Sequence, residues 1–238
     1  MQYKSLFPKG GILKLLKENP YLYLLLYWPV YFIFFMVAEN LIVDNYTVIY
    51  SPLDDLIPFC KWFAIPYVLW YPYIVLPLIW IMIKKASEFK RLMWFIMLTY
   101  TVTLIIYALF PNGQNLRPQT VEGNGLIALW MRFLYSYDTN TNVCPSIHVI
   151  GTLATTYALM HTKAGKKWWS VIIIVIMTIS ICISIVFVKQ HSIIDLYAGV
   201  ALCALAYPVI YNKKMKMRAE SDKVMPFSIS FKKKAEKE

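Results

Sequence analysis

Long apolar stretches alternate with short polar segments along this chain of 238 residues. Most of the stretches approach the ~20 residues that an α-helix needs to cross a bilayer, and the fourth is shorter. A soluble core does not require apolar runs of this length, so the pattern predicts an all-α polytopic membrane protein with six transmembrane helices. The predicted spans are residues 21–38, 62–83, 92–110, 147–160, 168–188 and 193–210.

Lysine and arginine concentrate on one side of the predicted membrane. The segments before the first span, between the second and third, between the fourth and fifth, and after the sixth are rich in these cations. The opposite segments are poorer in cations and carry acidic residues. Cytoplasmic loops hold the excess of Lys and Arg in membrane proteins, so both termini are predicted to be cytoplasmic. This topology accounts for the net charge of +11, and no nucleic acid partner is expected.

The same pattern divides the chain into three parts. Residues 1–20 mix leucine and isoleucine with lysine, which is typical of an amphipathic segment on the cytoplasmic membrane surface. Residues 21–211 form the six-helix membrane domain, and residues 212–238 form a basic cytoplasmic tail attracted to anionic lipid. The composition agrees, because only 16% of the residues are charged, whereas a soluble domain has about a quarter.

Polar residues gather at the predicted outer ends of three spans. The parity of the spans brings them to one membrane face, although they are scattered along the sequence. They are Arg117 after the third span, Ser146 and His148 at the start of the fourth, and Lys189, His191 and Asp195 at the start of the sixth. Ionisable residues within membrane spans are rare and mark functional sites.

His191 and Asp195 are four residues apart, so on a helix they share one face. An unpaired carboxylate at that depth costs about 2.5–3.5 kcal/mol, and a hydrogen bond from the histidine offsets this cost. The same bond fixes the tautomer of the imidazole and leaves its other nitrogen free. A nucleophilic or basic histidine needs this arrangement.

Each of these residues also has a structural interpretation. A histidine and an aspartate at this spacing often form a surface pair, Arg117 is a candidate interfacial anchor, and Ser146 is a candidate helix N-cap after Pro145. The two histidines and Asp195 are conceivable zinc ligands, but Arg117 is unfavourable beside a cation, so neither a metal nor a cofactor is predicted. Phosphate fits better, because a guanidinium binds phosphate oxygens in a bidentate fork.

Three short stretches carry a family resemblance: "LRP" with Arg117, "PSIH" with Ser146 and His148, and "SIVFVKQHSIID" with His191 and Asp195. They resemble the signature motifs of the type 2 phosphatidic acid phosphatase superfamily, whose members are six-span membrane enzymes that act on lipid phosphates. The resemblance covers roughly residues 110–199. It implies that His191 is the nucleophile that forms a phosphohistidine, that Asp195 orients it, and that His148 is the general acid and base. It also implies that Arg117 and Ser146 hold the phosphate oxygens.

The chain departs from the family's motifs at three positions. Phe110 stands where the first motif has a lysine, and Ile185 stands where the third motif has an arginine. Lys189, two residues before His191, is a candidate replacement for one of these phosphate-binding cations. Ile147 stands where many lipid phosphatases have glycine, and it resembles the branch that includes inositol phosphorylceramide synthases. Members of that branch pass a phospho-headgroup to the hydroxyl of another lipid.

Three functions follow from these observations. The first is a membrane lipid phosphatase that hydrolyses a lipid phosphate or pyrophosphate at the extracytoplasmic face. The second is a lipid phosphotransferase with a lipid alcohol as acceptor. The third is a non-catalytic transporter or scaffold with a degenerate site. The retained histidines and the buried acid favour an enzyme, and the short chain with few cysteines favours a bacterial plasma membrane.

Two further features stay open at this stage. Residues 119–142 contain "NGLIALWMRFLYSYD", which places Leu126, Trp130, Phe133 and Leu134 near one helical face. A short interfacial helix here either shapes lipid entry or simply links two spans. Cys60 and Cys144 lie on the same predicted side of the membrane, where a disulfide between them is conceivable.

Overall fold

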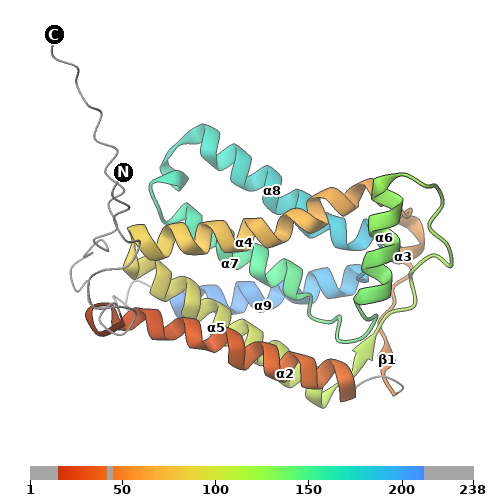
Figure 1. The fold of residues 1–238 in the computed structure, drawn as a ribbon, viewed down its shortest axis with the longest axis horizontal. Helices are drawn as coiled ribbons and strands as arrows, with labels where there is room; N and C mark the ends of the chain where they lie inside the picture. The colour runs from red at the N-terminus through yellow and green to blue at the C-terminus, as the bar shows by residue number, and fades with distance from the viewer. Residues whose placement is uncertain (1–15, 42–44, 212–238) are drawn as a thin grey trace, which may run out of the picture.

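The computed structural model describes residues 16–41 and 45–211 (Figure 1). Helices dominate this part of the chain, and the predicted all-α polytopic architecture is confirmed. The helical elements are η1 Pro20–Leu26, α2 Tyr27–Leu41, α3 Leu53–Leu56, η2 Lys61–Phe63, α4 Ala64–Lys84, α5 Ala86–Leu109, α6 Leu126–Tyr137, α7 Ile147–Met160, η3 Ala164–Lys166, α8 Trp168–Phe187 and α9 Ile193–Tyr211. Two short strands, β1 Thr47–Val48 and β2 Asn112–Gly113, pair in parallel.

Within the described residues, five helical segments are long and apolar enough to cross a membrane. They are Pro20–Asn40, Lys61–Lys84, Ala86–Leu109, Trp168–Phe187 and Ile193–Tyr211. The predicted fourth span is α7, which has only 14 residues and is about 21 Å long. Figure 1 shows α7 running lengthwise among the longer helices, and it packs against α4, α5, α8 and α9. The count of six spans and the cytoplasmic location of both termini remain predictions.

The third span begins earlier than its apolar run predicts. The predicted start is residue 92, whereas α5 begins at Ala86 directly after α4 ends at Lys84. Glu88 explains the difference, because its buried carboxylate is paired with Arg91 and lies 3.5 Å from the ammonium of Lys85. This ion-pair cluster neutralises the charges of the first helical turn, so the helix starts within a polar sequence.

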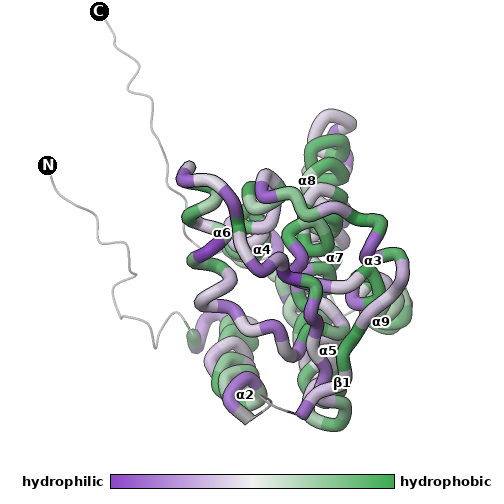
Figure 2. The backbone as a smooth tube through the Cα atoms, turned by 90° about the vertical axis from the view of Figure 1, so that its right-hand side faces the viewer, coloured by the Kyte–Doolittle hydropathy of each residue, from purple (hydrophilic) through white to green (hydrophobic). Residues whose placement is uncertain are grey.

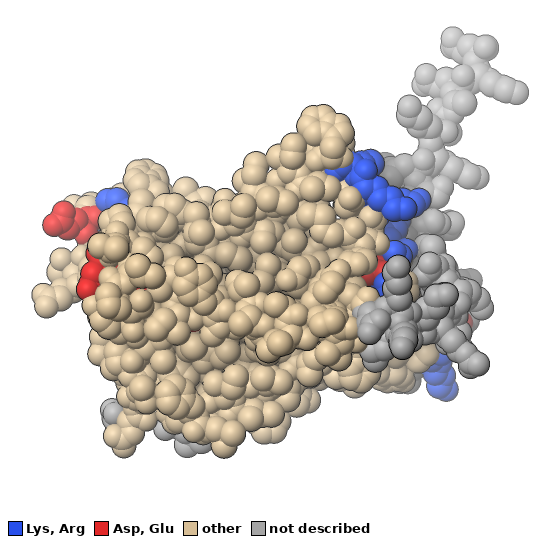
Figure 3. Space-filling model, turned by 180° about the vertical axis from the view of Figure 1, so that it is seen from behind, with Lys and Arg blue, Asp and Glu red and all other residues tan. Residues whose placement is uncertain are grey.

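The surface separates into an apolar belt and two charged ends. Figure 3 shows Lys and Arg side chains mainly at one end and Asp and Glu side chains mainly at the other, with an uncharged belt between them. Large apolar side chains are exposed along the belt, such as Ile33 on α2 and Leu205 on α9. Such exposure costs nothing in lipid, so the belt is the surface that faces the hydrocarbon core.

Small residues let α7 occupy the centre of the bundle. A Cβ at Gly151 would lie only 2.6 Å from the hydroxyl oxygen of Tyr100 and 2.7 Å from Cδ1 of Ile74. Glycine at this position therefore permits the close approach of α7 to α4 and α5. Ala154 and Ala158 follow at helical spacing, and both are buried in the same core.

The end of the bundle that carries α3, α6 and the strands holds the predicted site residues. Figure 2 shows this end facing the viewer, with hydrophilic loops around α6. The short helix predicted within residues 119–142 is present as α6, and its location at the membrane interface remains a prediction. Of the four residues predicted near one face of this helix, Leu134 is buried, whereas Leu126, Trp130 and Phe133 are exposed. The predicted basic tail and most of the predicted N-terminal amphipathic segment lie outside the described residues.

Candidate active site

His191 and Asp195 make the contact that their spacing predicts. The Nδ1 atom of His191 lies 3.2 Å from Oδ2 of Asp195 and 3.0 Å from the carbonyl oxygen of Val143. The helical argument for this pair is only half right, because α9 begins at Ile193 and His191 lies in the turn before it. Asp195 is completely buried, and the backbone N–H of Ser192 donates to the same Oδ2 at 3.0 Å.

The surroundings of His191 assign the roles of its two nitrogens. Both neighbours of Nδ1 are acceptors, so Nδ1 carries the proton and Nε2 carries the lone pair. The Nε2 atom lies 3.4 Å from the hydroxyl oxygen of Ser146. Ser146 occupies the N-cap position of α7, but its side chain makes no capping hydrogen bond. The structure therefore joins Ser146 to the histidine and gives no support to its interpretation as a simple cap.

His148 lies beside His191 in an aromatic setting. The two imidazole rings are 5.8 Å apart between centroids. The ring of His148 stacks on Tyr67 at 4.5 Å and lies against Trp70 at 4.3 Å. Both ring nitrogens of His148 are buried without a hydrogen-bond partner among the described residues. An orphaned pair of buried nitrogens needs a partner, and a bound substrate is the partner that an active site supplies.

Arg117 lies close to the histidines but is bound by protein acceptors. Its Nε atom donates to Oε1 of Gln190 at 3.0 Å, and its Nη1 atom donates to the carbonyls of Tyr135 at 3.2 Å and Asp138 at 3.0 Å. Its Nη2 atom donates to the carbonyl of Thr139 and to Gln190. These bonds connect the end of α6 to the turn that carries His191. Direct contact with phosphate requires the exchange of at least one of these acceptors.

Lys189, the predicted replacement for a phosphate-binding cation, contacts α3 in the structure. Its Nζ atom donates to the carbonyl oxygen of Asp54 in α3 at 2.7 Å. Burial lowers the pKa of Lys189, while the negative charges of Asp54 and Asp55 oppose this shift. The backbone of Lys189 has a φ of +52°, which non-glycine residues rarely adopt and which marks a constrained turn. In this geometry the lysine holds the turn before His191 against α3.

Asp54 is a functional candidate that sequence reasoning missed. Its Oδ1 atom accepts from the backbone N–H of Ile193 at 2.8 Å, and its Oδ2 atom accepts from the hydroxyl of Ser192 at 2.6 Å and from the N–H of Ser51 at 2.9 Å. The Asp54 carboxylate thus caps α9 from a distant part of the chain and fixes the two residues that follow His191. The sequence shows Asp54 only as one acid in an outer loop.

Asp138 and Gln190 also belong to this site. The Oδ2 atom of Asp138 accepts from the hydroxyl of Tyr67 at 3.3 Å and from Nε2 of Gln190 at 3.2 Å. Burial raises the pKa of Asp138, and the positive charge of Arg117 opposes this rise. The only sequence signal for Gln190 is its position next to His191, and Asp138 has no signal beyond its predicted outer location.

The positions of the missing family cations are apolar in the structure. Phe110 lies at the C-cap of α5 and is half exposed, whereas Ile185 is fully buried in the core beneath the site. Cys60 and Cys144 are both free thiols. Burial and the negative charge of Asp195 raise the pKa of Cys144 to about 12. Among the described residues, no three histidine, cysteine, aspartate or glutamate side chains form a group that could hold a metal ion.

The fold and the site define a polytopic membrane protein in which two histidines, a buried aspartate and an arginine meet at one end of a helix bundle. A model of the PAP2 superfamily matches residues 34–209, so the chain belongs to the PAP2 superfamily. This membership confirms the resemblance of the motifs and supports an enzyme of phosphoric ester chemistry, without separating the branches of the superfamily. No curated protein and no solved structure matches the chain.

Proposed function

We propose that this protein is a lipid phosphatase that hydrolyses a lipid phosphate or pyrophosphate at the extracytoplasmic face of a bacterial plasma membrane. The observation that carries the proposal is the arrangement of His191, whose Nδ1 is held by Val143 and Asp195 and whose Nε2 faces Ser146. The predicted orientation agrees, because the site lies at the end of the bundle opposite the cluster of Lys and Arg side chains (Figure 3).

The first chemical step transfers the phosphoryl group to the protein. The lone pair of His191 Nε2 attacks phosphorus and forms an N–P bond, while the bond from phosphorus to the lipid oxygen breaks. His148 gives its proton to the leaving oxygen, because its ring lies 5.8 Å from that of His191 and can contact the same phosphoryl group. The phosphorylated ring becomes an imidazolium, and the carboxylate of Asp195 stabilises this positive charge.

The second step releases phosphate. The now neutral His148 removes a proton from a water molecule, whose oxygen attacks phosphorus as the N–P bond breaks. His191 recovers its lone pair and inorganic phosphate leaves. Arg117 and Ser146 are proposed to hold the phosphate oxygens, and Arg117 does so by exchanging a carbonyl of the α6–α7 connection for a phosphate oxygen. Lys189 would contribute positive charge only if it left the carbonyl of Asp54.

The test measures phosphate release by the purified protein over a panel of lipid monophosphates and pyrophosphates, with EDTA present. Release is expected to survive EDTA and to vanish in His191→Ala. His161→Ala is the matched control, because His161 stacks on Tyr211 at the opposite end of the bundle and should be dispensable. An acid-labile phosphorylated intermediate in the wild type would support the histidine as nucleophile. Loss of activity in both His191→Ala and His161→Ala would contradict the assignment of His191 as the nucleophile.

A second candidate function is a lipid phosphotransferase, and the charge of the site favours it. The carboxylate of Asp138 lies near Arg117, and the positions of the two missing family cations are occupied by Phe110 and Ile185. A phosphate monoester carries about −1.5 to −2 charges at neutral pH, whereas a phosphodiester carries only one. A site with a single nearby arginine and an acid tolerates the diester better.

One competition experiment distinguishes the phosphatase from the phosphotransferase. The protein receives a lipid phosphate monoester and a phosphodiester lipid together, with a lipid alcohol as acceptor. Preference for the diester, with transfer of its headgroup to the alcohol, would support the phosphotransferase. Asp138→Asn is then expected to shift preference toward the monoester, because it removes one negative charge beside Arg117. If the wild type converts neither the monoester nor the diester, a non-catalytic transporter or scaffold is the remaining function.

A further inference from the structure

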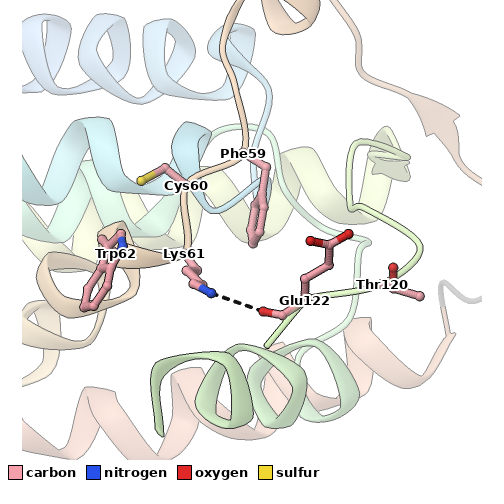
Figure 4. A pocket seen from close by; sticks show the side chains of 6 residues that line it. All are labelled: Phe59, Cys60, Lys61, Trp62, Thr120 and Glu122. Atoms are coloured by element: carbon pink, nitrogen blue, oxygen red, sulfur yellow. Dashed lines mark hydrogen bonds between the residues drawn. The ribbon is translucent and has the colours of Figure 1, made fainter. Parts of the chain in front are cut away.

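A cavity with polar and aromatic lining lies outside the histidine site. It has a volume of about 440 Å³ and is lined by Phe59, Cys60, Lys61, Trp62, Thr120 and Glu122 (Figure 4). The residues come from the start of the Lys61–Lys84 span and from the connection that precedes α6. None of them belongs to the proposed catalytic machinery. The volume falls within the range of small-ligand pockets, which is about 300–1,000 Å³.

The position of the cavity places it at the level of the lipid headgroups. Lys61 and Trp62 are the first residues of a candidate membrane span. The ring of Trp62 is exposed, and α6 nearby exposes Trp130 and Phe133. Tryptophan and other amphipathic aromatic side chains concentrate at the boundary between hydrocarbon and water. The cavity therefore opens where the phosphate and amine groups of phospholipids lie.

The lining carries one positive and one negative side chain beside an aromatic ring. The Nζ atom of Lys61 donates to the carbonyl oxygen of Glu122 at 3.1 Å, which uses one of its three N–H donors. Figure 4 shows the Glu122 carboxylate pointing toward the ring of Phe59, away from its own carbonyl. The cavity thus offers a cation for a phosphate at Lys61 and an anion for an ammonium at Glu122. The ring of Phe59 adds a cation–π surface for the same ammonium.

A second cation supports the loop that forms this cavity. The Nη1 atom of Arg132 donates to the carbonyls of Val121 at 2.8 Å and Gly123 at 2.9 Å. Together with Lys61, it binds three successive carbonyls, so the loop is held from both sides. A purely anionic ligand would meet the Glu122 carboxylate, and a purely cationic ligand would meet Lys61. The pair of opposite charges fits a zwitterion.

We propose that this cavity binds the headgroup of a zwitterionic phospholipid of the outer leaflet, with its phosphate at Lys61 and its ammonium between Glu122 and Phe59. The site is separate from the histidine pair and does not rest on the proposed function. Phosphatidylethanolamine is the probe of this chemistry, because it carries a phosphodiester and a primary ammonium.

Native mass spectrometry of the full chain tests the proposal. The protein is released from detergent in the presence of equal amounts of phosphatidylethanolamine, phosphatidylglycerol and glycerophosphoethanolamine. The phosphatidylethanolamine and the phosphatidylglycerol have the same acyl chains. Wild type is expected to retain phosphatidylethanolamine over phosphatidylglycerol. Lys61→Gln and Glu122→Gln are each expected to reduce that retention by up to about fivefold, the upper range for an exposed ion pair.

Three comparisons separate binding from loss of folding. Lys61→Arg should restore retention because it keeps a cationic donor, and Glu122→Lys should reverse the preference toward phosphatidylglycerol. Lys84→Gln, at the far end of the same span, should have no effect. The proposal is overturned if wild type shows no preference for phosphatidylethanolamine, or if both Gln variants retain it fully. Equal retention of glycerophosphoethanolamine, which lacks acyl chains, would also overturn it.

Discussion

Asp195→Asn separates two roles that the buried aspartate could have toward His191. An aspartate beside a histidine can fix the tautomer, or it can stabilise positive charge on the ring. In this site the carbonyl oxygen of Val143 lies 3.0 Å from Nδ1, closer than Oδ2 of Asp195 at 3.2 Å. The carbonyl is a permanent acceptor, so the Nδ1–H tautomer is expected to persist in the variant. Only the stabilisation of charge should be lost.

The magnitude follows from the distance between the charges. Opposite charges 3.2 Å apart attract by about 5 kcal/mol at an effective dielectric constant of about 20. The asparagine oxygen can still accept from His191 and from the N–H of Ser192, which retains part of this energy. A net loss of about 3–4 kcal/mol in transition-state stabilisation is therefore expected, and it corresponds to a fall in kcat of about 10²–10³-fold.

The assay is phosphate release under saturating lipid phosphate, with His191→Ala as the measure of complete loss. The expected activity of Asp195→Asn lies clearly above that of His191→Ala and clearly below wild type. Activity as low as that of His191→Ala would show that the carboxylate, not the carbonyl of Val143, fixes the tautomer. Activity equal to wild type would refute the electrostatic role altogether.

The remaining predictions concern the residues around the histidines. Arg117→Lys cannot replace every bond that the guanidinium makes, so the free energy of unfolding should fall by about 1–3 kcal/mol; an unchanged melting temperature in detergent would contradict this. Asp54→Asn should lower kcat because the amide keeps only one of the two acceptor oxygens that bind Ser192 and Ile193, whereas Asp55→Asn should not; equal kcat values for the two variants would refute the role of Asp54. Burial raises the pKa of Asp138, so its negative charge costs more free energy in the folded protein than in the unfolded chain. Asp138→Asn should therefore be more stable than wild type near neutral pH, and this advantage should vanish as pH falls toward the ordinary aspartate value of 3.8; a difference that does not change with pH would contradict the assignment.

Much of the fold was predictable because it depends on local pattern. A run of apolar residues specifies a membrane helix through its own length and composition, whatever its neighbours are. The parity of the spans then brings Arg117, His148 and His191 to one end of the bundle without any knowledge of packing. The contact between His191 and Asp195 was also predictable, since residues four apart remain close even when the first lies just before the helix.

The bounds of the helices were less predictable, because the length of an apolar run does not show where ion pairs extend a helix into polar sequence. The predicted third span begins at residue 92, yet α5 begins at Ala86. The buried Glu88 with Lys85 and Arg91 makes the extension possible. Leu134 on α6 shows the same limit on a smaller scale. Periodicity places it near the face of Leu126, Trp130 and Phe133, but it does not show that Leu134 is buried in the core while the other three are exposed.

The sequence by itself determined the class of the protein, the long apolar helices and the identities of the paired histidines and their aspartate. Only the tertiary structure decided which groups surround them. Asp54 caps the helix after His191 across 138 positions of sequence, and Gln190 with the α6–α7 connection occupies Arg117. These contacts depend on how the helix ends and loops fold together. Polar groups there form hydrogen bonds with whichever groups lie close in space. Periodicity and spacing report neighbours along the chain, so they carry no signal for such pairs.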